Sequence, residues 1–93
     1  MPPLLSPDRV SALLADLPGW TLDGAALRRE FVFAGFPEAV AFVQRLVAPS
    51  EAADHHPDLE IHYRRVIVRF TTHSAGGLTE LDVAVARVAD QVA

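Results

Sequence analysis

The spacing of apolar side chains changes along this chain, and the changes limit the folds it can adopt. Residues 25–33 and 59–71 alternate between apolar and other side chains, which is the pattern of β-strands. Between them, residues 36–47 place apolar side chains three and four positions apart, as in a helix with one buried face. We therefore expect a helix packed against a sheet, because each apolar face needs a partner.

Turn signals divide the alternating stretches into two hairpins. Asp23-Gly24 precedes residues 25–33, and Asp-Gly is among the strongest short hairpin signals. The later alternation is interrupted at Arg64-Arg65, where we expect the second turn. Two hairpins predict a four-stranded antiparallel sheet.

Helix signals stand before and after the hairpins. Ser6-Pro7 is typical of a helix start, and residues 79–82 have the form of a capping box before a last apolar stripe. The predicted order is α-β-β-α-β-β-α. The fold class is α+β, a two-layer sandwich with three helices on one face of the four-stranded antiparallel sheet. Residues 1–93 are expected to form a single domain.

Pro49 lies inside the middle helical stretch. Proline lacks an N–H and clashes with the preceding helical turn. We therefore expect the helix to kink or end near Ala48, with Ser50 capping a short continuation that carries Glu51 toward His55.

Composition argues against several functional classes. The chain has no cysteine, so disulfides, a thiolate nucleophile and a thiolate zinc site are excluded. The net charge is −4 and all 8 basic residues are arginines, which disfavours nucleic acid as a partner. The N-terminal residues lack the basic leader of a signal peptide, and no apolar run reaches membrane-spanning length. We expect a cytoplasmic protein without membrane or nucleic-acid partners.

Three of the 4 histidines are candidates for the functional site. His55 and His56 are adjacent, and Pro57 favours a helix end at this pair. His73 lies at the end of the last predicted strand, before a glycine-containing loop. Neighbouring side chains on a helix point about 100° apart, so this pair cannot face one ion, and no metal site is expected.

These imidazoles have two interpretations. Each one alone is more typical of a solvated loop side chain. Together they suit paired general acid and base work, because imidazoles titrate near neutral pH. Glu51 precedes His55 by four residues, within reach along a helix, and is expected to orient that ring.

A longer pattern surrounds the histidines and resembles the pterin-4a-carbinolamine dehydratase family. The matching residues are Glu51-x3-His55-His56-Pro57, Tyr63, Thr72-His73, Gly77-Leu78-Thr79 and Asp82. Gly19-Trp20 and Phe31-x-Phe33-x-x-Phe36 extend the resemblance over nearly the whole chain. Leu59 departs from it, since the family often carries a bulky aromatic residue there.

The resemblance implies a hydro-lyase that dehydrates 4a-hydroxytetrahydropterin to quinonoid dihydropterin, and so recycles the tetrahydropterin. The pterin is then the substrate, and neither a cofactor nor a metal is expected. The implied catalytic residues are His55, His56 and His73, with His55 and His73 as acids at the leaving hydroxyl and His56 mainly binding substrate. The implied substrate-binding residues are His55, His56, Pro57, Thr72, His73, Ser74 and Ala75.

Two carboxylates and the partners complete the expectations. Glu51 and Asp82 are implied as supporting residues behind the site, and Asp82 is expected to cap the last helix rather than act directly on substrate. The family commonly forms homodimers or homotetramers, which we expect here too. Two alternatives stay open: a non-catalytic dimerisation or assembly scaffold on the same fold, and a related pterin activity such as one in molybdopterin metabolism.

Overall fold

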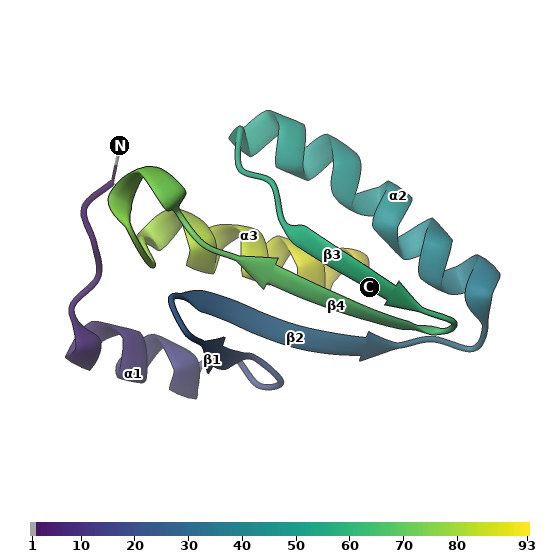
Figure 1. The fold of residues 1–93 in the computed structure, drawn as a ribbon, viewed down its shortest axis with the longest axis horizontal. Coiled ribbons are helices and arrows are strands. Elements are labelled where there is room, and N and C mark those ends of the chain that lie inside the picture. The colour runs from purple at the N-terminus through teal and green to yellow at the C-terminus, as the bar shows by residue number, and fades with distance from the viewer. Residues whose placement is uncertain (1) are drawn as a thin grey trace.

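The computed structural model describes residues 2–93 and confirms the predicted order of elements. The elements are α1 (Pro7–Ala15), β1 (Thr21–Asp23), β2 (Ala26–Val32), α2 (Phe36–Ala53), β3 (Asp58–His62), β4 (Arg65–Phe70), the short 3₁₀ helix η1 (His73–Ala75) and α3 (Glu80–Val92). The strands form one antiparallel sheet in the order β1-β2-β4-β3 (Figure 1). Within residues 2–93, no helix is long and apolar enough to cross a membrane.

The inner face of the sheet forms the core with the helices. Pairing places Leu27 of β2 opposite Phe70 of β4, and Phe31 opposite Val66, and all four side chains are buried. The helices α2 and α3 pack against each other and against β4, and the same cluster takes Leu13 from α1 and Leu17 from the turn after it. The alternation of the strands produces this face because successive side chains point to opposite sides of a sheet.

The edge strand β3 is less well covered. Leu59 and Ile61 pair with Val68 and Val66, so they lie on the inner face, but they remain 37% and 40% exposed. The turn after β3 begins at Tyr63, which has φ 55° and is 70% exposed. Tyr63 is exposed because the β3–β4 turn begins one residue before the Arg64-Arg65 turn that we expected.

Pro49 does not end its helix. We expected the helix to kink or end near Ala48; it does not end there, since α2 runs through Pro49 to Ala53, and Ser50 is a buried helical residue rather than a cap. Burial explains the continuation, since Leu46 and Ser50 on either side of Pro49 are both held in the interior. The helix ends at Asp54, whose left-handed φ of 48° turns the chain away from the helix axis.

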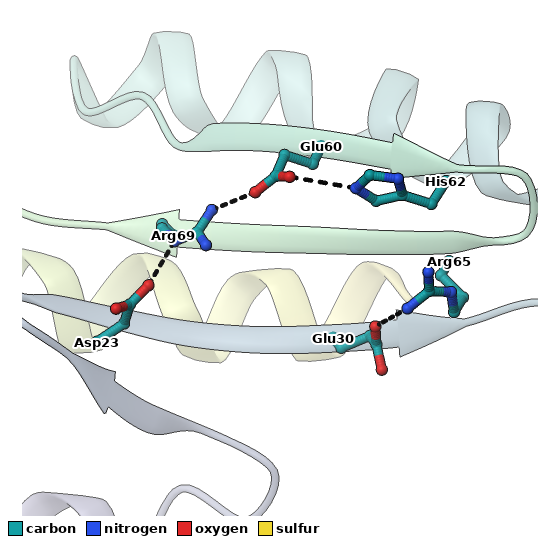
Figure 2. A network of polar contacts seen from close by, with 6 residues as sticks. All are labelled: Asp23, Glu30, Glu60, His62, Arg65 and Arg69. Atoms are coloured by element: carbon teal, nitrogen blue, oxygen red, sulfur yellow. Dashed lines mark hydrogen bonds and ion pairs between the residues drawn. The ribbon is translucent and has the colours of Figure 1, made fainter.

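The outer face of the sheet carries charged side chains that bridge its strands. Figure 2 shows Asp23, Glu30, Glu60, His62, Arg65 and Arg69. Arg69 of β4 donates to Asp23 at 2.7 Å and to Glu60 of β3 at 2.5 Å. The hydrogen bond from Arg69, with a smaller one from His62, holds the pKa of Glu60 below its usual value. His62 is exposed on this face.

A partly buried polar contact ties the end of α3 to the first hairpin. Trp20 Nε1 donates to both carboxylate oxygens of Asp90, at 3.0 and 3.1 Å. Arg29 of β2 donates to Asp90 Oδ1 at 2.8 Å and to the Pro18 carbonyl at 3.3 Å. Its guanidinium also lies 4.5 Å from the centre of the Phe31 ring. These contacts tie α3 to β2 and to the residues before β1.

Candidate active site

His55 is the buried member of the histidine pair. The left-handed residue Asp54 turns the chain, and the His55 N–H donates to the Ser50 carbonyl at 3.0 Å. The imidazole is then nearly parallel to the Phe70 ring of β4, with ring centres 6.2 Å apart. Its side chain is 10% exposed. The end of α2 therefore directs His55 into the molecule.

Asp82 is the partner of His55. Its side chain is fully buried, and Oδ1 lies 2.5 Å from His55 Nε2. Its other oxygen, Oδ2, accepts from the Thr79 N–H at 2.9 Å and from Thr72 Oγ1 at 2.8 Å. The predicted capping box is present, with Asp82 at its third helical position. Asp82 thus caps α3 and also holds the imidazole, a second contact that we did not predict.

His56 faces the other way. Its side chain is 54% exposed, and Nε2 donates to Glu51 Oε2 at 3.1 Å. We expected Glu51 to orient His55, and the structure corrects this assignment. Glu51 and His55 are four residues apart but do not share a helix face, because the helix ends at Ala53 and the left-handed Asp54 turns the chain before His55. An exposed ion pair of this kind adds little stability.

A groove runs between α2 and β3 beside His56. Its volume is about 280 Å³, close to the lower end for small-ligand sites. Glu51, His56 and Ser50 provide its polar atoms, and the walls are apolar: Val43, Leu46, Val47, Pro57 and Leu59. Leu59, the residue that departs from the family pattern, forms part of its wall.

His73 lies on the loop that follows β4. It opens η1 and is exposed, as is Ser74, while Ala75 is half-buried. The loop is closed by the Thr72 N–H, which donates to the Gly77 carbonyl at 3.0 Å. Thr72 is buried, and its hydroxyl contacts the same carboxylate as His55. Asp82 therefore links the His73 loop to the end of α2.

The predicted residues thus fall into three adjoining groups. His55, Thr72 and Asp82 form a buried hydrogen-bonded cluster, His56 and Glu51 form an exposed pair at the groove, and residues 73–75 form the loop beside Thr72. Within residues 2–93, no group of three or more histidine, aspartate or glutamate side chains could hold a metal ion. What the arrangement offers is proton transfer by imidazoles with fixed carboxylate partners.

Sequence reasoning assigned Thr79 no part in the site beyond its capping motif. Its side chain is fully buried, and its Oγ1 lies 2.9 Å from Thr72 Oγ1. A signal was present, because capping boxes usually carry Glu or Gln at the third helical position and this one carries Asp82. Besides the capping Thr79 N–H, the Asp82 carboxylate accepts from Thr72 and His55.

Comparison with known proteins identifies the family. Residues 3–92 match the family model described as pterin 4 alpha carbinolamine dehydratase. A relative from Nostoc sp. is 48% identical over 92 residues, with 99% of both chains covered, and one from Thermomicrobium roseum is 51% identical over 78 residues, with 84% of each covered. Both carry the provisional name pterin-4-alpha-carbinolamine dehydratase.

Two solved structures share the fold. A transcriptional coactivator/pterin dehydratase from Brucella melitensis superposes with a TM-score of 0.91 at 37% identity, covering 96% of this chain and 97% of that one. A pterin dehydratase-like protein described as a RuBisCO assembly factor in the alpha-carboxysome gives a TM-score of 0.67 at 25% identity, covering 80% and 88%. By the extent of its family match and its identity to these relatives, this chain belongs to the pterin 4 alpha carbinolamine dehydratase family.

Proposed function

We propose that this protein is a hydro-lyase that dehydrates a 4a-hydroxytetrahydropterin to the quinonoid dihydropterin. The observation that carries the proposal is the buried pair of His55 and Asp82, in a chain of this family. The names of the relatives support the same reaction. In a cell that hydroxylates aromatic amino acids, this reaction returns the pterin to the pool that is reduced again.

The reaction needs only proton transfers. The C4a–O bond breaks, and the hydroxyl leaves as water after it receives one proton. The N5 lone pair forms the C4a=N5 double bond, and N5 then loses its own proton. One water molecule is released, and no electron is gained or lost overall. For this reason we propose that the protein uses neither a metal nor another cofactor.

The imidazoles are assigned to these transfers as the family resemblance implies. His55 and His73 act as acids at the leaving hydroxyl, and His56 mainly binds the pterin. Pro57 and residues 72–75 line the pterin site. Groups of this kind typically accelerate a reaction by about 10²–10⁴-fold each. Glu51 supports the site by holding His56, with which it makes its hydrogen bond.

We propose that the protein acts as a cytoplasmic homodimer or homotetramer. The support is apolar surface on α2 and on the edge strand β3. Phe36 of α2 is 52% exposed and Ile61 of β3 is 40% exposed, and neither lines the groove beside His56. A chain of this size gains stability when such surface is covered by a second copy.

A second candidate is a non-catalytic assembly role on the same fold. The observation that favours it is the likeness to the RuBisCO assembly factor. A scaffold does not require a histidine to be buried against a carboxylate. The His55–Asp82 contact therefore favours the enzyme, and catalysis is the first property to test.

The test is a stopped-flow measurement of the dehydration of synthetic 4a-hydroxytetrahydropterin. The wild-type protein is compared with buffer, with His55→Ala and His73→Ala, and with His62→Ala. His62 is a matched control because it is an exposed histidine on the outer face of the sheet. We expect a large acceleration by wild type and by His62→Ala. A wild-type rate equal to that of buffer would refute the proposal and leave the assembly role as the candidate.

A further inference from the structure

The buried hydrogen bonds around Asp82 allow the hydrogens to be assigned one by one. A carboxylate only accepts hydrogen bonds, whereas a threonine hydroxyl donates one and accepts others. Asp82 Oδ2 has two donors close by, the Thr79 N–H at 2.9 Å and Thr72 Oγ1 at 2.8 Å. Its Oδ1 is left for His55 Nε2. The side chains of Thr79 and Asp82 are fully buried and Thr72 is nearly so.

The two threonine hydroxyls have one consistent direction. Thr79 Oγ1 accepts from the backbone of α3, including the Leu81 N–H at 3.3 Å. Its own hydrogen is then free for Thr72 Oγ1, which is 2.9 Å away. Because Thr72 accepts this hydrogen, it can donate its own to Asp82. The chain of hydroxyls thus runs from Thr79 through Thr72 to Asp82.

This order determines which nitrogen of His55 carries a hydrogen. Donated hydrogen bonds stabilise the ionised form of a carboxylate, and imidazole is ordinarily a stronger base than carboxylate. The hydrogen between Asp82 Oδ1 and Nε2 therefore belongs to the ring, which donates it to the ionised carboxylate. With Nε2 occupied in this way, the lone pair of the neutral ring is on Nδ1.

We propose that Thr72 and Thr79 are positioning residues that fix His55 in the tautomer with hydrogen on Nε2, so that Nδ1 is the atom that exchanges a proton with the substrate. They act through Asp82: the Thr72 hydrogen bond prevents the carboxylate from rotating away from the ring. The tautomer is a property of the protein alone, whereas the role of Nδ1 toward the substrate rests on the proposed dehydratase function.

The first test is a ¹H–¹⁵N correlation spectrum of the labelled histidine rings, recorded where His55 is neutral. We expect wild type to show hydrogen on Nε2, with a proton signal shifted to low field by the hydrogen bond to the ionised Asp82. Thr72→Val has nearly the same shape but no hydroxyl, and should move this signal upfield. Thr72→Ser restores the hydroxyl and should restore the signal. Hydrogen on Nδ1 in wild type, or a signal unchanged in Thr72→Val, would overturn the proposal.

Kinetics provide a second, separable test. Thr72→Val should lower kcat about tenfold, the effect of one lost hydrogen bond to a charged group, with KM changed less than about twofold. A rise in KM alone would show that Thr72 serves binding only and would refute the positioning role. If the wild-type protein showed no dehydration at all, the proposed function would fail, while the ring spectrum would still decide the tautomer. If Thr72→Val does not fold, the wild-type spectrum still shows which nitrogen of His55 carries the hydrogen.

Discussion

Replacing Pro49 with alanine should stabilise the protein, although proline is the stiffer residue. Pro49 lies in the interior of α2, where a proline costs about 3 kcal/mol relative to alanine because it removes one helical hydrogen bond and clashes with the preceding turn. Two losses oppose this gain. Alanine gives the unfolded chain more freedom, which costs about 0.4–1 kcal/mol.

The second loss is packing. Pro49 is half-buried and lines a small cavity of about 120 Å³ with Leu46, Ala53 and Phe70. Removing about one buried methylene costs about 0.8 kcal/mol. The net effect is a stabilisation of about 1–2 kcal/mol, and each kcal/mol raises the Tm by about 4–8 °C in a domain of this size. Urea and thermal unfolding followed by circular dichroism would measure it.

Pro37→Ala is the matched control. Pro37 lies in the first turn of the same helix, where a backbone N–H has no partner within the helix. Alanine therefore adds no helical hydrogen bond there. The greater conformational freedom of the unfolded chain should destabilise the protein by about 0.4–1 kcal/mol. Opposite signs for the two variants are the prediction. A Pro49→Ala variant that is less stable than wild type would show that packing, not the missing hydrogen bond, dominates at this position.

Three further variants test other parts of the structure. Gly19→Ala should destabilise the fold by about 1–3 kcal/mol in urea, because φ is +89° and a Cβ would lie 2.8 Å from Arg29 Nε. Glu60→Gln should remove a pH-dependent contribution to the free energy of unfolding, because Arg69 lowers the pKa of Glu60 from 4.5 in the folded protein. In wild type this contribution is complete above pH 4.5 and is lost as the pH falls through the lower folded pKa. Acid titrations of the two proteins that run parallel would contradict this. Glu51→Gln should raise KM for the pterin and leave the Tm within about 1 °C, since its ion pair is exposed.

The fold was predictable because each element has its own local signal. Asp23-Gly24 and the capping box at residues 79–82 lie where the structure has a turn and a helix start. Pro49 shows the limit of such signals. Its local effect opposes a helix, but the packing of Leu46 and Ser50 depends on contacts with distant segments, and those contacts decide the outcome.

The residues of the site could be predicted from the sequence, but the hydrogen bonds between them could not all be predicted. The spacing of Glu51 and His55 suggested a contact along a helix. The left-handed residue Asp54 turns the chain, and Glu51 forms its hydrogen bond with His56 instead. The contact between His55 and Asp82 joins residues 27 positions apart. It depends on how α2 and α3 dock, which no local pattern specifies. Burial of Thr79 beside Thr72 follows from the same docking.

The most direct test of the account compares two histidines in the dehydration assay. His55 is buried against Asp82, whereas His62 is exposed on the outer face of the sheet. We predict that His55→Ala lowers kcat/KM for 4a-hydroxytetrahydropterin by about 10²–10⁴-fold, while His62→Ala stays within about twofold of wild type. Equal rates for the two folded variants would contradict the assignment of His55 as the proton-transfer group.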